Sequence, residues 1–590
     1  MNRGRFVGNE HGIAMMVVLL VALAVGAISL GAGLMSMNTQ AINTYSDRMG
    51  TLQTAADAGI ELARARINAN KSLYPDSSYS TLEAGVQVKD ASGNAIPGVQ
   101  RWTYVGPTGI STGQYGVFGS VVTVVKDKVG DQIVRRGEVY QESFAKFAYF
   151  TDIEGNIVFA NGDQIWGPVH SNDQIQIYNH TPTPQAWFHN TVETAQTIKN
   201  KSYAQFDQGY TEHGANIPMP TTADLGKLQA QAAAGLTSIT GSTAGTLGQA
   251  TTRIEFVAVD INGDGKIDGD NEGFMRVYQV NNTADAWWVV GDLDVSNYTQ
   301  DSPNCADSTA HNALYVAATS HPTTPATHTA LVAMQKSTAR CFLGGSEYLT
   351  SDNKFHATDA YGQWLPWPGT VDPAVQAVRP DSAAYLWPIN RQFNPSFKGV
   401  IYVSGNVAIS GTLRGQVTVA ATGNIVIADD MRYATDPGAG TCADMLGMFA
   451  GNDVVVADNT LNSPQRPGNG LNYRTYDDTQ DEFIQGVVLA LDQFTVENYN
   501  GGSTNAEPCG GVQAGRGCLY LTGGIIQESR GPVGLTNGSG YIKRYAYDQC
   551  VLGNPPPYFP TTGHFARGRQ FEVDPVGFNV ASYYASLSPH

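Results

Sequence analysis

Residues 12–67 read GIAMMVVLLVALAVGAISLGAGLMSMNTQAINTYSDRMGTLQTAADAGIELARARI, and this stretch decides the fold. It carries no charge from Ile13 to Ser46, and residues 13–35 are almost wholly apolar. That is about the 20 residues that an α-helix needs to cross the hydrocarbon core of a bilayer. The sequence therefore predicts a membrane-spanning helix at the N-terminus.

The helical pattern continues beyond the apolar run. Apolar or small residues recur at steps of three and four, which places them on one stripe of a helix. They are Ile42, Tyr45, Met49, Leu52, Ala56, Gly59, Ala63 and Ile67. No proline occurs before Pro75, so we predict one helix over 13–70, of which the part from Ile13 to Ile67 is roughly 80 Å long. Its first half suits lipid or a packed filament core, and its second half suits a globular domain lying against it.

The segment before the apolar run, MNRGRFVGNEHG, is short, polar and basic, and it ends in glycine. A secretory signal peptide would have a shorter apolar core and an A-x-A-like cleavage site, and neither is present here. Residues 1–12 resemble the leader of a type IV prepilin, which implies cleavage between Gly12 and Ile13. The stretch AADAGIELARARI (55–67) also resembles the AEAGIE-like stretch found in larger minor pilins. An uncleaved signal anchor is the alternative.

One residue departs from the pilin pattern. Most pilins have glutamate as the fifth residue after the cut, and this chain has Val17. Among pilin-like proteins, that absence resembles the minor pilins proposed to sit at a filament tip. The resemblance therefore implies a minor rather than a major subunit.

The length, charge and cysteines bound the class of protein. A chain of 590 residues should hold two or more domains. Its net charge of −17 argues against a nucleic-acid partner and suits an extracellular surface that holds divalent cations. Six cysteines follow residue 300 without a C-x-x-C pair, so disulfides are favoured over zinc. By closeness in sequence we favour Cys305–Cys341 and Cys509–Cys518, which leaves Cys442–Cys550; free buried thiols are the alternative.

Strand patterns follow Pro75. Val99–Val105, Tyr115–Lys126 and Gln132–Glu142 are rich in Val, Tyr and Thr. They predict a small antiparallel sheet over 71–142 that packs on the upper helix, and this arrangement resembles the pilin head.

Residues 143–565 have a different sequence pattern, in which short apolar runs alternate with Gly, Asn and Asp. In FKGVIYVSGNVAISGTLRGQVTVAATGNIVIADDMRY (397–433), apolar pairs recur every six to eight residues. Strands this short share one core when they stack as parallel rungs. We predict a large parallel β-helix-like solenoid, with an antiparallel sandwich as the alternative. The fold class is α+β, mainly β, with an insertion at 281–390, a short helix at 221–236 and a C-terminal tail at 566–590.

Several stretches of this region resemble an uncharacterised domain family found on large pilin-like proteins. They are Gly162-Asp163, GPVHSN (167–172), GVIYVSGNV (399–407), and GYIKRYAYD (540–548) followed by PPPYFP (555–560). That family has no established activity, so the resemblance implies location and fold rather than chemistry.

The strongest site signal is DINGDGKIDGDNEG at 260–273. Its alternating oxygen side chains around Gly265 have the spacing of an EF-hand-type calcium loop. The expected Ca²⁺ ligands are Asp260, Asn262, Asp264, Lys266 through its carbonyl group, Asp268 and Glu272. Asn271 stands where such loops usually have glutamate, so Glu272 is one residue late and Asp270 is an alternative ligand. The flanks read as strands, so we predict structural calcium in a β context.

Catalytic motifs are missing from the sequence. It has no nucleophile elbow, no H-E-x-x-H and no phosphate loop, so we do not expect an enzyme. His170 and His189 lack a third metal ligand. Asp429 and Asp430 are strand neighbours, whose side chains point to opposite faces.

These patterns predict a calcium-stabilised, type IV pilus-like minor pilin that acts in filament assembly, at the tip or in adhesion. We expect it in the inner membrane before assembly and in an extracellular filament afterwards. The expected partners are other pilins through the N-terminal helix, the membrane, and a cell-surface or polysaccharide ligand. Tryptophans such as Trp287 and Trp288 could stack on sugars, although a position in the core and at a strand edge is the simpler interpretation of this pair. The alternatives are a membrane-anchored β-helix carbohydrate-active enzyme and a surface scaffold unrelated to pili.

Overall fold

The chain divides into two compact units. The computed structural model describes residues 10–75, 77–108, 116–241, 250–280, 357–358, 362–437, 441–456, 482–497, 499–500, 509, 517–537, 539–573 and 578–587. Unit 1 comprises 1–110, 118–140 and 563–590, and unit 2 comprises 111–117 and 141–562. Along the sequence, unit 2 is therefore an insertion within unit 1.

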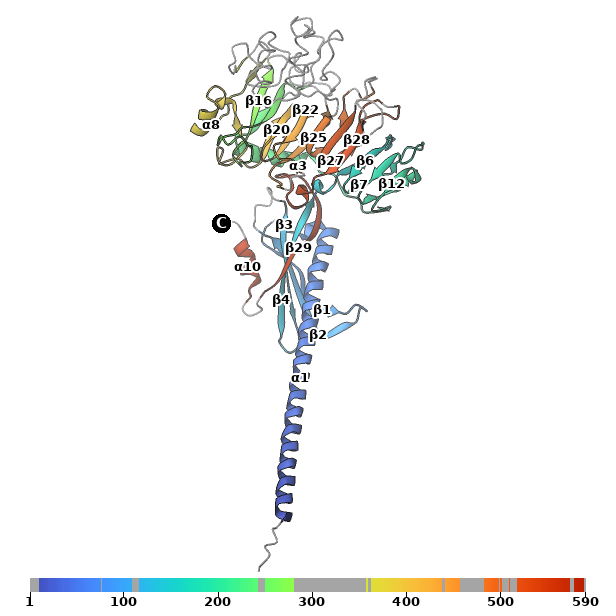
Figure 1. Ribbon diagram of the computed structural model, residues 1–590, viewed down its shortest axis with the longest axis vertical. Coiled ribbons are helices and arrows are strands. Elements are labelled where there is room, and N and C mark those ends of the chain that lie inside the picture. The colour runs from blue at the N-terminus through green and yellow to red at the C-terminus, as the bar shows by residue number, and fades with distance from the viewer. Residues whose placement is uncertain are drawn as a thin grey trace, which may run out of the picture. The chain divides into compact units, whose positions relative to one another are not determined.

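Unit 1 is built on one long helix, α1 (Glu10–Ala69), which runs without a break past Met35 and is followed by a short turn, η1 (Lys71–Leu73). A five-stranded sheet accompanies it, in the order β1-β2-β3-β4-β29, and β1 to β4 are antiparallel neighbours (Figure 1). The strands are β1 (Ser80–Lys89), β2 (Ala95–Pro107), β3 (Phe118–Lys126), β4 (Gln132–Ser143) and β29 (Thr561–Val573). The predicted helix and antiparallel sheet are both present.

Both faces of this sheet are covered. Val125 and Ile133 pack with Leu52 of α1 on one face. Val124 and Val134 pack with Tyr584 on the other face, because neighbouring side chains of a strand alternate between faces. Tyr584 belongs to α10 (Val580–Leu587).

The C-terminal segment differs from the predicted tail at 566–590. In the structure it contributes strand β29 and helix α10 to unit 1. The neighbour of β29 in the sheet is β4, which lies far away in sequence, so no hairpin signal indicates the pairing.

Unit 2 is dominated by a 22-stranded sheet with parallel and antiparallel pairs. From β19 to β27, most strands pair in parallel with the strand two positions later, such as β19 with β21 and β20 with β22. These strands are β19 (Val400–Ser404), β20 (Val407–Leu413), β21 (Gln416–Ala421), β22 (Ile425–Tyr433), β23 (Met445–Ala450), β24 (Val454–Val456), β25 (Glu482–Ala490), β26 (Phe494–Val496), β27 (Cys518–Ser529) and β28 (Ile542–Tyr547).

The first strands of unit 2 continue this ladder beyond its last ones. β27 pairs in parallel with β5, and β28 with β6; we call these two pairings the seam. Figure 1 shows the orange-red β27 and β28 beside the teal β6 and β7. The early elements are η2 (Phe144–Lys146), β5 (Tyr149–Ile153), β6 (Asp163–Trp166), β7 (Val169–Ser171), β8 (Ile175–Gln176), β9 (Ala186–Phe188), β10 (Val192–Thr194), β11 (Ile198–Lys199), η3 (Lys201–Tyr203), β12 (Ala204–Phe206) and β13 (Tyr210–Thr211).

At the other end of the ladder, β14 (Ser238–Thr240) pairs with β19, and β15 (Thr252–Ala258) pairs with β20. β15 also forms an antiparallel hairpin with β16 (Gly273–Val280), which in turn pairs with β17 and β18. The remaining elements are α3 (Thr222–Ala234), β17 (Gly362–Trp364), α8 (Pro373–Val378), η5 (Ala383–Tyr385), β18 (Trp387–Pro388) and α9 (Cys550–Gly553). Of the predicted insertion, β17 and β18 thus join the sheet. Residues 281–356, with Trp287 and Trp288, lie outside the described residues.

The apolar pairs that recur in 397–433 are buried in one core cluster, which confirms that part of the pattern. The alternate side chains of the same strands are also covered in places. Val400 and Tyr402, for example, pack in a second cluster with Leu225 of the predicted helix α3. Strands buried on both faces read as nearly continuous apolar runs. The solenoid itself stays a prediction.

A ladder of side chains links the turns between these strands. The Oδ1 atom of Asn406 accepts the backbone N–H of Asn424 at 2.8 Å, and Oδ1 of Asn424 accepts that of Asp453 at 3.2 Å. Oδ1 of Asp453 accepts the N–H of Gln493 at 3.1 Å. Each turn thereby supplies the acceptor that the next turn needs, which satisfies backbone groups between the rungs.

The acidic member of this ladder gives a stability prediction. Burial and the nearby charge of Asp492 raise the pKa of Asp453. A raised folded-state pKa means that the contribution of this carboxyl to stability is lost as the pH rises. We expect Asp453→Asn to stabilise unit 2 at pH 7, by less than about 1 kcal/mol because solvent screens this partly exposed carboxyl, and to stabilise it less at pH 4. Chemical denaturation measures both effects. The reverse substitution, Asn424→Asp, should destabilise unit 2. Equal effects of the two substitutions on stability would refute the role of the buried charge.

Candidate functional site

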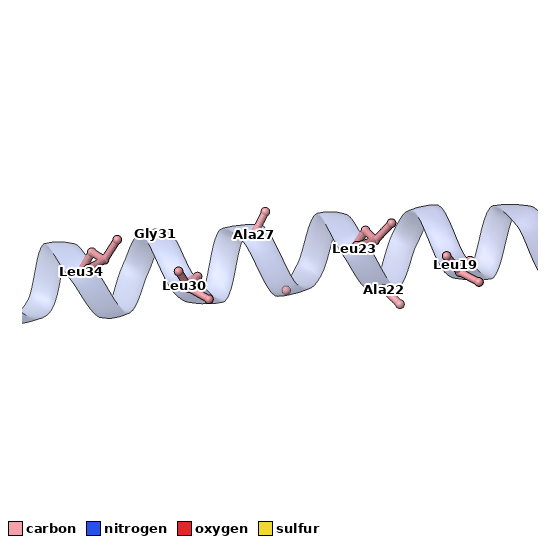
Figure 2. Close-up of a pocket in the computed structure, with 8 residues that line it drawn as sticks. Leu19, Ala22, Leu23, Ala27, Leu30, Gly31 and Leu34 are labelled. Atoms are coloured by element: carbon pink, nitrogen blue, oxygen red, sulfur yellow. The ribbon is translucent and has the colours of Figure 1, made fainter.

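The N-terminal half of α1 carries the first candidate site. Its side chains from Gly12 to Ser46 are exposed, apart from Gly31, which is half-buried. The helix is long and apolar enough to cross a membrane. Figure 2 shows a stretch of it, along which Leu19, Leu23, Leu30 and Leu34 line a shallow apolar depression. This half is therefore available to lipid or to other apolar helices.

The C-terminal half of α1 is built to pack on protein. Leu52, Ala56, Ala63 and Ile67 of the predicted stripe are buried. Gly59 is buried too, and a Cβ atom there would lie 2.7 Å from Cγ2 of Thr123 on β3. The small residue thus lets the sheet approach the helix closely.

The predicted stripe is not buried along its whole length. Ile42 and Tyr45 are 64% and 53% exposed. The boundary between the exposed and packed parts of α1 therefore lies between Tyr45 and Leu52. Periodicity marks the helical face but does not show where the sheet ends.

A buried ion pair fixes the sheet to α1. Arg101 of β2 donates two hydrogen bonds to Glu83 of β1, at 2.7 and 3.0 Å, and its Nη1 donates to the carbonyl oxygen of Ala55 at 3.1 Å. Thr103 donates to the same carboxylate at 2.7 Å. Sequence patterns did not point to these residues, although VQRWTYV (99–105) places a charged residue inside an apolar strand.

The predicted calcium loop connects β15 to β16, so its strand flanks are confirmed. The Asp260 carboxylate accepts the backbone N–H groups of Gly263 and Gly265, each at 2.7 Å. Asn262 and Asp264 accept the N–H groups two residues on, both at 2.9 Å. Gly263 and Gly265 have φ values of 75° and 80°, a region that favours glycine. The first half of the loop therefore has the compact turn that the spacing predicts.

Glu272 contacts this loop through backbone N–H groups. It is fully buried, and its carboxylate accepts the N–H groups of Gly269 at 2.8 Å and Ile261 at 3.3 Å. The nearby Arg414 donates to the carbonyl oxygens of Gly269 and Asp268 and lies 3.7 Å from the Asp270 carboxylate. Within the described part of the chain, no three His, Cys, Asp or Glu side chains form a group that could hold a metal.

The two histidines considered as metal ligands have other partners. His170 is buried, stacks on Phe150 and hydrogen-bonds Asn172 at 3.0 Å; burial lowers its pKa although Asn172 and Glu193 oppose the shift. His189 pairs instead with Asp207 at 2.8 Å.

The acidic pair considered for catalysis does not form a described site either. Asp430 accepts hydrogen bonds from Arg432 and from the N–H of Phe483, and nothing is described of the Asp429 side chain.

The cysteines of the described region are paired. Cys442 is bonded to Cys550 and Cys509 to Cys518, two of the pairs favoured from sequence. Cys305 and Cys341 lie outside the described residues. Disulfides are consistent with an extracellular location, and the apolar helix with membrane anchoring.

Comparison with known proteins adds little. No family model and no curated protein matches the chain. The crystal structure of the competence-associated pilin ComZ from Thermus thermophilus aligns with 88% of this chain and 96% of its own. The identity is 11% and the TM-score 0.27, a likeness too low to carry an argument. The functional conclusions therefore rest on the residues and contacts above.

Proposed function

We propose that the chain is a pilin-like minor subunit of an extracellular filament. One observation carries the proposal: α1 is continuous, its first half is apolar and exposed, and its second half is held against an antiparallel sheet. Such a helix can be stored in a membrane by its first half and then pack among similar helices in a filament. Other pilins are thus the partners of α1.

The leader supplies the test. Co-expression with a prepilin peptidase should remove residues 1–12 and leave Ile13 as the N-terminus. Gly12→Glu should block this step, whereas Gly26→Ala, within the exposed apolar half, should not. Mass spectrometry of the N-terminal peptide detects the cleavage, and mass spectrometry of purified filaments detects incorporation of the chain. An N-terminus still at Met1, or filaments without this chain, would contradict the proposal.

We propose further that unit 2 is a β-solenoid displayed by this filament subunit. The parallel pairing of strands two positions apart and the ladder of turn side chains support it. Stacked rungs share their core only with their neighbours, which lets a long domain grow from short strands. This role needs no catalysis.

The loop at 260–273 is proposed to bind Ca²⁺. Asp260, Asn262 and Asp264 and the Lys266 carbonyl offer the hard oxygen donors that calcium takes, and Asp268 or Glu272 would complete the set. The cation would offset the repulsion between these carboxylates. Calcium would therefore be structural.

Calcium should stabilise unit 2. At 100 times its Kd, a ligand of the folded state adds about 2.7 kcal/mol of stability. We expect Ca²⁺ to raise the unfolding temperature and to give heat in isothermal titration, and Asp260→Ala to abolish both. Asp90→Ala is the matched control, since Asp90 also accepts two backbone N–H groups in a turn but lacks the loop spacing. Unchanged calcium heat in Asp260→Ala would exclude the site.

A further inference from the structure

The outer face of three neighbouring rungs carries aromatic and amide side chains. β6, β9 and β12 are parallel, with Gln164 beside Trp187 and Trp187 beside Gln205. Their neighbours Ile165 and Phe188 are in the core, so the side chains on either side of them point outward. We call the outward set the aromatic face. It consists of Gln164, Trp166, Trp187, His189, Gln205 and Asp207.

One carboxylate holds this face rigid. Asp207 accepts hydrogen bonds from Nε1 of Trp187 at 2.9 Å, from Nε2 of Gln205 at 2.9 Å and from Nδ1 of His189 at 2.8 Å. The His189 ring stacks on Trp166, with centroids 4.6 Å apart and planes at 9°. It also lies 4.4 Å from the ring of Trp187. Ordered aromatic side chains lose little conformational entropy when they bind a ligand.

The face is open to solvent although it is largely aromatic. Trp166 is 38% exposed, Gln205 and Asp207 are exposed, and the other members are half-buried. Large aromatic side chains normally lie inside a protein, so an ordered and exposed Trp166, stacked on the half-buried His189, requires an explanation. The nearby amides and carboxylate provide donors and acceptors beside these rings.

We propose that the aromatic face binds an uncharged glycan chain. A sugar ring offers C–H faces to aromatic side chains and hydroxyl groups to amides and carboxylates. The rungs repeat about every 4.8 Å, so the face offers a regular series of contacts to a linear polymer. The Asp207 charge and the net charge of −17 disfavour anionic polymers, including nucleic acid and acidic polysaccharides. The site does not depend on incorporation into a filament.

The test uses the full chain in a polyoxyethylene detergent, because maltoside head groups would compete. Cellohexaose, chitohexaose, laminarihexaose and mannohexaose are titrated while tryptophan fluorescence and heat are recorded. We expect at least one to bind, and Trp166→Ala to weaken it about tenfold, as for a tryptophan at the centre of an interface. Gln205→Ala should weaken it less. Tyr140→Ala removes an exposed aromatic side chain of unit 1 and should change nothing.

The outcomes separate clearly. Near-ultraviolet circular dichroism establishes whether each variant is folded. If Trp166→Ala does not fold, the loss of binding is measured with Gln205→Ala instead. The proposal is overturned if no probe binds, or if binding survives both substitutions. It is equally overturned if oligo-dT or polygalacturonate binds at this face in place of the neutral glycans. Failure here would leave the cleavage and filament tests of the subunit role unaffected.

Discussion

Replacing Arg530 by methionine is expected to lower the free energy of unfolding of unit 2 by about 3–5 kcal/mol, because it leaves a buried charge unpaired. Arg530 follows β27, and Glu154 follows β5, its partner across the seam. Their side chains are buried and meet at 2.8 Å. The substitution therefore acts where the end of the ladder joins its beginning.

The surroundings of Arg530 satisfy the rest of its guanidinium group. It donates to the carbonyl oxygens of Ile157 and Val158, each at 3.3 Å, and lies 3.8 Å from the ring centre of Phe159. A second buried pair, Lys543 with Asp163 at 2.9 Å, joins β28 to β6. Two buried pairs at one seam specify its register, because a shifted strand would bury both charges without partners.

The pH dependence identifies the mechanism. Burial raises the pKa of Glu154 even though Arg530 opposes the shift, so removal of Arg530 should raise it further. A carboxyl with a raised folded-state pKa loses its contribution to stability as the pH rises. The loss in Arg530→Met should therefore be larger at pH 8 than at pH 5. Arg530→Met combined with Glu154→Leu should recover most of the loss, since no buried charge remains.

Hydrogen exchange of peptides from β5 and β27 is the measurement, since it reports on the seam without assuming that both units unfold together. Lys201→Met is the control, because Lys201 pairs with Glu212 at 2.8 Å on the surface, where solvent screens the interaction and its loss should have little effect on stability. Equal exchange in Arg530→Met and Lys201→Met would show that the pair does not hold the seam.

Local patterns predicted the elements of this fold well, and long-range contacts poorly. The stripe on α1 and the apolar pairs of 397–433 follow from periods of 3.6 and 2 residues, which sequence displays directly. The turns of the Asp260 loop follow from glycine and Asx chemistry at fixed spacing. Each of these features is decided within a few neighbouring residues.

The seam and the C-terminal strand were not predictable in this way. Arg530 and Glu154 are 376 residues apart, and nothing local indicates that the last strands of unit 2 lie beside its first. Gly162-Asp163 and GYIKRYAYD (540–548) both resemble the uncharacterised domain family, yet the pairing of Lys543 with Asp163 appears only in the folded chain. β29 was missed for the same reason, since β4 lies far from it in sequence. Sequence therefore gave the candidate calcium loop but not the ion pairs that join distant strands.

The second large effect is expected at α1, where Glu83→Gln should destabilise unit 1 by about 3–5 kcal/mol by leaving Arg101 buried without a counter-charge. Burial alone would raise the pKa of Glu83, but hydrogen bonds from Arg101 and Thr103 and the charges of Arg101 and Arg66 outweigh it, so the pKa is lowered. A lowered folded-state pKa gives stability that is present above the usual carboxyl pKa and is lost as the pH falls. Amide hydrogens of unit 1 in the wild-type chain should thus lose protection from exchange as the pH falls. In Glu83→Gln, which has no carboxylate to protonate at this position, acid should cause little further loss of protection.

Hydrogen exchange in the second half of α1 distinguishes this mechanism from a general loss of packing. Arg101 bonds the Ala55 carbonyl, so Glu83→Gln should increase exchange around Ala55 and in β1 while leaving the seam of unit 2 unchanged. Glu61→Gln is the matched control, because Glu61 lies on the same helix and pairs with Arg64 at the surface, where a pair contributes less than about 1 kcal/mol. Similar exchange in the two variants would refute the role of Glu83. A selective effect would establish that a buried charge pair, and not the apolar stripe alone, holds the sheet on α1.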